Sequence, residues 1–237
     1  MTGGEKYQYK LLPEIPDILS ILTSTYGPQT VPPAQDVFEW VLWELVAYLA
    51  VDSKRLSAFC KLKGSIGTLP EQILAASPET LRDIGSAGIM PEQSVSKLRS
   101  AAEIAMIEFG GEVDDILALP LTAARKALQK FPSIGAPGAD KILLFSRAFP
   151  IFALESNGLR ALIRLGFGSE TGDYTRSYRS AMNDLGPQLP QDYDSLISLH
   201  LLLRTHGRKT CRRTNPACAD CPLSSQCAYA TLGIRSV

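Results

Sequence analysis

Residues 206–227 read HGRKTCRRTNPACADCPLSSQC, and four of the five cysteines of the chain lie within this run. They are spaced as Cys211-x6-Cys218-x2-Cys221-x5-Cys227. In a reducing cytosol, clustered cysteines are more often metal ligands than disulfides. Four thiolates suit either a zinc ion or an iron–sulfur cluster, and the spacing leaves both open because it contains only one C-x2-C pair. Cys60 stands apart from the group.

Composition describes an ordinary globular chain whose two parts differ in charge. The 237 residues are 45% hydrophobic and carry 24 basic and 24 acidic side chains. No apolar run reaches the ~18 residues of a membrane span and no signal peptide is visible, so we expect a cytoplasmic protein. Residues 1–157 carry 14 basic and 18 acidic side chains, but residues 158–237 carry 10 and 6. Zero net charge by itself argues against a nucleic-acid partner. The excess of basic side chains in residues 158–237 nevertheless makes such a partner possible.

The spacing of apolar residues predicts an all-α fold. Phe38 begins a series of apolar residues at three- and four-residue steps that ends at Leu49, which predicts a buried helix over 37–50. Convincing strand patterns are absent. Further helices are expected at 53–62, 70–76, 78–84, 92–109, 121–130, 137–148, 158–166, 174–185 and 191–205.

The cysteine run resembles the C-terminal [4Fe–4S] loop of the endonuclease III family of DNA glycosylases, in its HGR-x-x-C start and its x6-x2-x5 spacing. The resemblance extends over about residues 30–230. It implies a structural [4Fe–4S] cluster held by four ligands: Cys211, Cys218, Cys221 and Cys227. His200 and His206 are then expected to pack and form hydrogen bonds rather than bind metal.

Basic side chains gather at the start of the same run. Arg204 and Arg213 flank three residues that the resemblance places against DNA phosphates: Arg208, Lys209 and Arg212. A solvated basic surface is the alternative interpretation.

Residues 121–148 resemble the helix–hairpin–helix of that family, whose pattern is L-P-G-[VI]-G-x-[KS]-[TA]-A. Glycines in such a turn let the backbone approach a phosphate at a helix N-terminus. Here residues 131–139 read FPSIGAPGA. The predicted DNA contacts are Ser133, Gly135, Ala136 and Gly138, with Ser133 in place of the first family glycine.

Pro137 occupies the position where bifunctional members of the family carry a Schiff-base lysine. Proline has no primary amine, so lyase activity is not expected. Lys141 lies one helical turn further on and is either a substitute nucleophile or a surface lysine.

The segment 154–160, LESNGLR, matches the family pattern V-D-x-[HN]-x-x-R, with Glu155 where the family has its catalytic aspartate. Base removal passes through a cation-like sugar, so a fixed carboxylate stabilises it and activates water. Glu155 is therefore a candidate catalytic residue, together with Asn157. The alternative is a helix N-terminal glutamate favoured by the helix dipole.

Glu44 lies where related adenine glycosylases have a glutamate that protonates the departing base. It is either this general acid or one half of a structural ion pair with an arginine. Tyr48 lies where the family commonly has a glutamine that enters the duplex, and it either wedges between bases or packs in the core.

The resemblance implies two helical domains around a cleft that receives a flipped nucleotide. A helical barrel is expected at 37–147, and residues 1–36 plus 148–237 are expected to form the cluster domain. The expected protein is a monomeric, monofunctional glycosylase acting on damaged or mismatched bases in duplex DNA. Because the chain ends at Val237, without the extra domain of adenine glycosylases, pyrimidine-derived bases are the default. A catalytically weak lesion-binding protein is the alternative, and an electron carrier is a remoter one.

Overall fold

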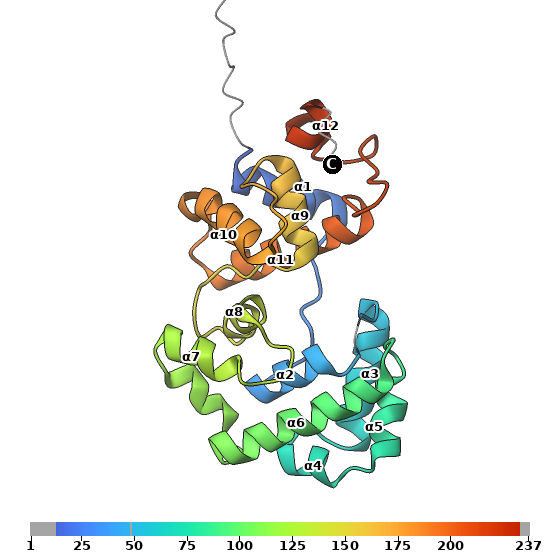
Figure 1. Cartoon of the computed structure of the whole chain (residues 1–237). Helices are drawn as coiled ribbons and strands as arrows, with labels where there is room; N and C mark the ends of the chain where they lie inside the picture. Colours follow the sequence, from blue (N-terminus) through green and yellow to red (C-terminus); the bar gives the residue numbers. More distant parts are fainter. Residues whose placement is uncertain (1–12, 48, 233–237) are drawn as a thin grey trace, which may run out of the picture. The chain divides into compact units, whose positions relative to one another are not determined.

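The computed structural model describes residues 13–47 and 49–232, and in these ranges it contains helices and no strand, which confirms the all-α prediction (Figure 1). None of the described helices is long and apolar enough to cross a membrane. The α-helices are α1 (Ile15–Tyr26), α2 (Val37–Leu45), α3 (Asp52–Ser65), α4 (Pro70–Ala75), α5 (Pro78–Gly85), α6 (Pro91–Phe109), α7 (Leu121–Leu128), α8 (Ala136–Phe145), α9 (Ser156–Leu165), α10 (Tyr174–Leu185), α11 (Tyr193–Lys209) and α12 (Ala228–Leu232).

The chain divides into two compact units. Unit 1 contains the described residues up to Gln29 and those from Leu154 onward, and unit 2 is Thr30–Ala153. The division falls seven residues before, and six residues after, the boundaries of 37 and 147 expected from the sequence.

The helix predicted over 37–50 is too long. α2 ends at Leu45, and Leu49 has a positive φ of 54° and a 65% exposed side chain. After Leu45 the chain bends instead of adding another helical turn, but Val46, the C-cap residue, is still buried in the core, so the apolar series continues past the helix. Helix α1, the 3-10 turn at Val113–Ala118 and helix α12 were not predicted.

Helix α2 forms the centre of unit 2. Trp40 packs edge-on against Phe145 of α8 with ring centroids 5.1 Å apart, and Trp43 packs in the same way against Phe59 of α3 at 5.5 Å. Apart from Glu44, every residue of α2 is buried. A helix surrounded by other helices is apolar on all sides, which explains this composition.

Glu39 is a charged residue inside this core, with a 3% exposed side chain. Its carboxylate accepts hydrogen bonds from Lys63 Nζ at 2.6 Å, Thr68 Oγ1 at 2.9 Å and the Gln35 backbone N–H at 2.9 Å. Burial alone would raise the pKa of Glu39, but these donors outweigh it and lower that pKa below its usual value of 4.5.

We expect Glu39→Gln to lower the free energy of unfolding by about 1–2 kcal/mol at pH 7, because a charge-assisted hydrogen bond becomes a neutral one. Because the pKa of Glu39 is lower in the folded state, its ionised carboxylate stabilises the protein above about pH 4.5. This stabilisation is lost as the pH falls through the folded-state pKa. The melting temperatures of the wild-type and Glu39→Gln proteins, measured between pH 7 and pH 3, should therefore converge as the pH falls. A gap that stays constant with pH would contradict this account.

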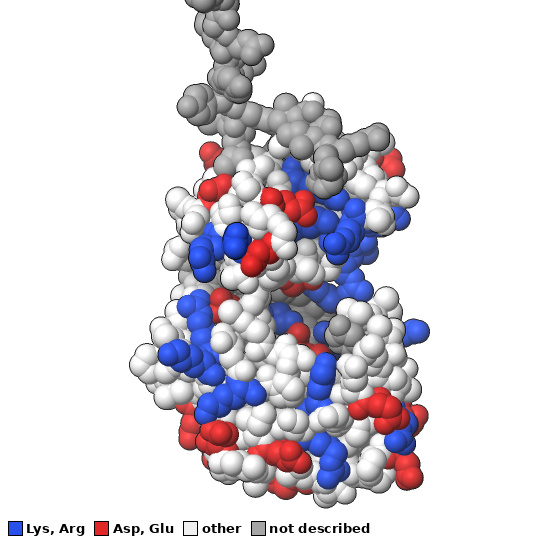
Figure 2. Space-filling view, viewed as in Figure 1, with Lys and Arg blue, Asp and Glu red and all other residues white. Residues whose placement is uncertain are grey.

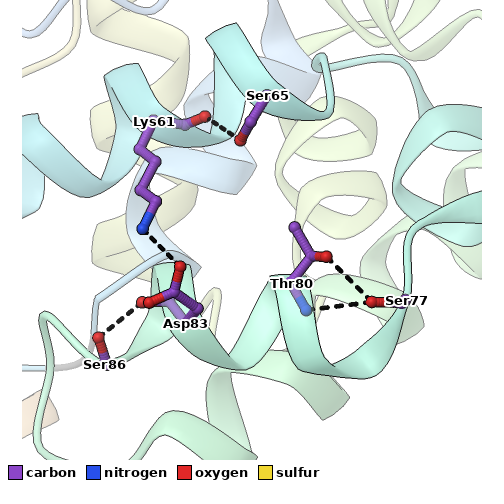
Figure 3. A network of polar contacts seen from close by, with 6 residues as sticks. All are labelled: Lys61, Ser65, Ser77, Thr80, Asp83 and Ser86. Atoms are coloured by element: carbon purple, nitrogen blue, oxygen red, sulfur yellow. Dashed lines mark hydrogen bonds and ion pairs between the residues drawn. The ribbon is translucent and has the colours of Figure 1, made fainter.

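Polar contacts join α3 to α5 on the surface of unit 2 (Figure 3). Lys61 Nζ lies 2.5 Å from Asp83 Oδ2, and Ser86 Oγ donates to the Asp83 carbonyl. Ser77 caps the start of α5 by accepting from the Thr80 backbone N–H at 3.2 Å. Both charged partners are exposed, so the pair contributes ~0–1 kcal/mol.

In unit 1, helices α9 and α11 pack closely against each other, and α1 packs against α11. Glycines make this contact close. A Cβ added at Gly207 of α11 would lie 2.3 Å from the Asn157 carbonyl oxygen of α9, and one at Gly158 of α9 would lie 3.4 Å from Leu203 Cβ of α11. The start of α9, which contains Glu155 and Asn157, is thus pressed against the end of α11.

Candidate active site and cysteine loop

Glu155 is the N-cap residue of α9. Its Oε1 accepts a hydrogen bond from the Gly158 backbone N–H at 2.8 Å, and its Oε2 accepts from Asn157 Nδ2 at 2.8 Å. N-cap residues usually have shorter side chains than glutamate. Glu155 nevertheless reaches the backbone N–H of Gly158, so its longer side chain bends back toward the first turn of α9. The helix-terminal position expected as an alternative is the one observed, and it holds both carboxylate oxygens in place.

Asn157 connects Glu155 to the end of α11. Its Oδ1 accepts from Arg160 Nη2 at 2.9 Å, and the same nitrogen donates to the Gly207 carbonyl at 2.7 Å. Arg160 Nε also donates to the Cys211 carbonyl at 3.0 Å. The candidate carboxylate is therefore joined through two side chains to the cysteine loop (residues 211–227).

The four cysteines of the cysteine loop line one pocket in unit 1, together with His206 and Arg164. Burial raises the pKa of the Cys211 thiol and that of the Cys221 thiol. Metal binding at this pocket would therefore release protons. Among the residues that the structure describes, no three His, Cys, Asp or Glu side chains are gathered as one metal ion would require.

Arg164 of α9 organises the cysteine loop from one side. Its Nη1 lies 3.5 Å from Cys211 Sγ and donates to the Arg212 carbonyl at 2.7 Å, while Nη2 donates to the Arg213 carbonyl at 3.1 Å. Its guanidinium also stacks over Tyr229 of α12 at 4.7 Å. Arg164 was not predicted from the sequence, although it lies one helical turn after Arg160.

His206 is buried beside the cysteines. Its Nδ1 lies 3.0 Å from Tyr26 Oη, and its Nε2 lies 3.8 Å from Cys221 Sγ. Burial lowers the pKa of His206 to about 4, so the ring is neutral at pH 7. His206 forms hydrogen bonds, as predicted from the sequence.

The predicted phosphate contacts lie around the end of α11. Lys209 and Arg212 are exposed and Arg208 is half-buried. Arg212 Nη2 donates to the Asn215 carbonyl at 3.0 Å, and Lys209 Nζ lies 5.8 Å from the centre of the Tyr26 ring. Figure 2 shows Lys and Arg side chains grouped on the right-hand side of unit 1.

The helix–hairpin–helix of unit 2 consists of α7, a short turn and α8. Ser133 has a φ of 62°, so it adopts the left-handed conformation that favours the glycine of the family pattern. Phe131 and Ile134 are buried and anchor the turn, whereas Ser133, Gly135 and Ala136 are exposed and Gly138 is half-buried. Arg125 of α7 pairs with the buried Asp140 of α8 at 2.5 Å and joins the two helices.

Gly135 has no structural need to be glycine. Its φ is −85°, and the nearest atom to an added Cβ is Pro137 Cδ at 3.9 Å. We expect Gly135→Ala to leave the melting temperature within ~2 °C of wild type and to weaken duplex DNA binding several-fold, because the methyl group occupies the face that a phosphate would approach. Thermal melts and fluorescence anisotropy check the two halves, and unchanged DNA affinity would contradict the hairpin contact.

Glu44 and Lys141 form an ion pair in unit 2. Lys141 Nζ lies 2.5 Å from Glu44 Oε1, and their side chains are only 18% and 19% exposed. The structural alternative for Glu44 was an ion pair with an arginine, and the partner found here is a lysine. Lys141 is accordingly not a surface lysine. Because Oε1 of Glu44 is engaged by Lys141, the ion pair competes with a role for Glu44 as proton donor to a base.

Tyr48 lies outside the described residues. Two further residues of unit 1, Gly207 and Tyr174, were not predicted to belong to the site. Gly207 belongs to the quoted HGR run, but its contact with Asn157 is visible only in the fold. Tyr174 lies beside Glu155 and belongs to no motif; its hydroxyl is 3.4 Å from the Leu154 carbonyl oxygen.

Comparison with known proteins agrees with this arrangement. The chain is 26% identical over 198 residues to endonuclease III of Sulfolobus acidocaldarius, covering 82% of this chain and 83% of the relative. It is 26% identical over 160 residues to endonuclease III of Thermotoga maritima, covering 68% of each. No family model matches the chain.

Solved structures share the fold. A trapped endonuclease III–DNA covalent intermediate superposes with a TM-score of 0.72 at 19% identity, covering 93% of this chain and 97% of that one. A thermostable thymine-DNA glycosylase superposes with a TM-score of 0.72 at 17% identity, covering 91% and 94%.

The helical units, the hairpin and the cysteine loop define a protein with the helix–hairpin–helix DNA glycosylase fold. Within that class, the chain is similar to endonuclease III in sequence and in fold.

Proposed function

We propose that the protein is a base-excision-repair DNA glycosylase that hydrolyses the N-glycosidic bond of a damaged or mismatched base in duplex DNA, without lyase activity. The observation that carries the proposal is the carboxylate of Glu155, held at the start of α9 by Gly158 and Asn157. A preorganised anion stabilises the positive charge that develops on the sugar as the base departs.

The proposed roles follow from the contacts. Glu155 stabilises the sugar cation and directs water, and Asn157 orients Glu155. The hairpin residues Ser133, Gly135, Ala136 and Gly138, with Arg208, Lys209 and Arg212, hold the DNA backbone. Glu44 stays a candidate for protonating the base, subject to its ion pair with Lys141.

The absence of lyase activity rests on residue chemistry. Pro137 has no amine, and the Lys141 Nζ is engaged in an ion pair with Glu44. Both observations support hydrolysis by water over attack by an amine.

The test is a panel of duplexes that carry uracil, a thymine–guanine mismatch, thymine glycol, or adenine opposite oxidised guanine. We expect an abasic product from at least one duplex and no covalent protein–DNA adduct after borohydride reduction. A trapped adduct that disappears in Lys141→Met would overturn the monofunctional assignment. Lesion-specific binding without base release on every duplex would favour the catalytically weak lesion-binding protein instead.

A [4Fe–4S] cluster is the proposed occupant of the cysteine pocket. Four thiols line one pocket in unit 1. An all-thiolate set of four ligands suits an iron–sulfur cluster, and the HGR-x-x-C start and x6-x2-x5 spacing favour the cluster over zinc. Bound there, the cluster would cross-link the cysteine loop that Arg160 and Arg164 hold against α9.

Anaerobically purified protein should contain about four iron atoms and four acid-labile sulfides per chain, because each thiolate binds one iron of the cluster. Cys218→Ala should lower both contents, whereas Cys60→Ala, outside the pocket, should leave them unchanged. One zinc per chain without sulfide would contradict the cluster.

A further inference from the structure

Tyr174 is the first residue of α10 and lies next to the candidate carboxylate. Asp173 caps the helix by accepting from the Arg176 backbone N–H at 3.0 Å, which fixes the backbone at this point. The Tyr174 hydroxyl donates a long hydrogen bond, 3.4 Å, to the carbonyl oxygen of Leu154, the residue immediately before Glu155.

The Tyr174 side chain contacts Leu154 and Tyr178 but is not enclosed. Its hydroxyl end is tied to Leu154, and its ring lies against Tyr178, one turn further along α10, with centroids 6.2 Å apart and an interplanar angle of 34°. Nevertheless 44% of the residue is exposed. A fixed aromatic ring with an open surface costs little entropy to use as a contact surface.

The surroundings of Tyr174 also keep it uncharged. Burial, and secondly the negative charge of Glu155, raise the pKa of Tyr174 to about 12. The ring is therefore a neutral phenol throughout the range in which a glycosylase works. A neutral phenol adds no phenolate charge that would repel the DNA backbone.

We propose that Tyr174 is a substrate-binding residue whose ring stacks on the extruded nucleobase while Glu155 faces the sugar. The inference rests on the proposed glycosylase function. Enzymes that extrude a nucleotide bind the base by stacking it on aromatic side chains, and the contact tolerates different bases because each has a π-face. Tyr174 is suited to this role because it is an exposed ring, hydrogen-bonded at its hydroxyl, beside the residue assigned to the sugar.

The test compares Tyr174→Ala and Tyr174→Phe with Tyr193→Ala as the matched control. Tyr193 also follows an aspartate N-cap as the first residue of its helix, α11. Affinities are measured by anisotropy for each base-bearing duplex of the panel above, and for the same duplexes with a tetrahydrofuran abasic site. The abasic duplex keeps the backbone contacts and removes the base.

Loss of one stacking contact corresponds to a roughly ten- to hundred-fold change in affinity. Tyr174→Ala should weaken binding to the base-bearing duplex by this factor and leave binding to the abasic duplex nearly unchanged. Tyr174→Phe should bind both like wild type, because the ring is retained. Tyr193→Ala should also bind both like wild type.

Two results would overturn the proposal. Equal weakening on both duplexes, or equal weakening by phenylalanine and alanine, would show that the hydroxyl supports the start of α9 rather than the ring holding a base. Absence of base release by the wild-type protein on every duplex of the panel would instead refute the glycosylase function on which the proposal rests.

Discussion

Gly207→Ala should destabilise unit 1 by about 3 kcal/mol or more and abolish detectable base excision. The added Cβ would lie 2.3 Å from the Asn157 carbonyl oxygen, 2.7 Å from its carbonyl carbon and 2.8 Å from its Cβ. Because most of these atoms are backbone, no rotamer change relieves the overlap, and α9 must move away from α11. Overpacking usually costs about 1–3 kcal/mol, and a clash with rigid backbone lies at or above the upper end.

The displacement would reach the candidate site directly. Asn157 orients Glu155, and the Gly207 carbonyl accepts from Arg160. A shift of ~1 Å at a reacting group costs on the order of 10²-fold in rate, so activity should fall even where the protein still folds. Thermal melts and single-turnover excision measure the two effects.

Gly172→Ala is the matched control for this substitution. Gly172 lies in unit 1, its φ is not in the left-handed region, and an added Cβ meets no atom within 4 Å. It should melt and excise like wild type. A Gly207→Ala protein that also behaves like wild type would show that the close α9–α11 contact is not required.

Glu155→Gln should reduce the rate of base excision on the order of 10³-fold with a melting temperature within a few degrees of wild type. The amide oxygen can still accept from the Gly158 N–H, so the helix cap is kept. The negative charge that stabilises the developing sugar cation is removed, and loss of one such electrostatic contact costs about 10²–10³-fold. Single-turnover rates on the excised duplex measure the effect.

Two further variants separate the charge from the fold. Glu155→Asp keeps the charge and supplies an ordinary N-cap, so it should melt like wild type and lose less activity than Glu155→Gln. Glu103→Gln neutralises an exposed glutamate of unit 2 and should have no effect. Equal activity of Glu155→Gln and wild type would refute the catalytic assignment, leaving Glu155 as a helix cap alone.

Several properties followed from residue types and short-range spacing. Apolar residues at three- and four-residue steps identified the helices, because such a pattern acts within a few turns of one helix. The cysteine spacing predicted that the four thiols gather within a 17-residue loop, and in the structure they line one pocket. The lack of an amine at position 137 could be predicted whatever the fold, because a proline side chain contains no primary amine.

Other properties depend on how helices pack and had no signal in local spacing. Glu44 meets Lys141 across 97 residues, and Tyr174 reaches Leu154 across 20. The need for glycine at position 207 arises from a backbone carbonyl on another helix. Leu49 continued an apolar pattern beyond the end of its helix, because hydrophobic spacing does not report where the backbone bends.

The zero net charge shows the same distinction. Composition alone opposed a nucleic-acid partner, and the division along the chain into an acidic and a basic part could be read from the residues. Which basic side chains remain available to DNA is a matter of tertiary contacts: Arg160 and Arg164 are taken up by backbone carbonyls of the α11 end and the cysteine loop, while Lys209 and Arg212 stay exposed. Charge type is encoded residue by residue, but its accessibility arises only when distant helices pack together.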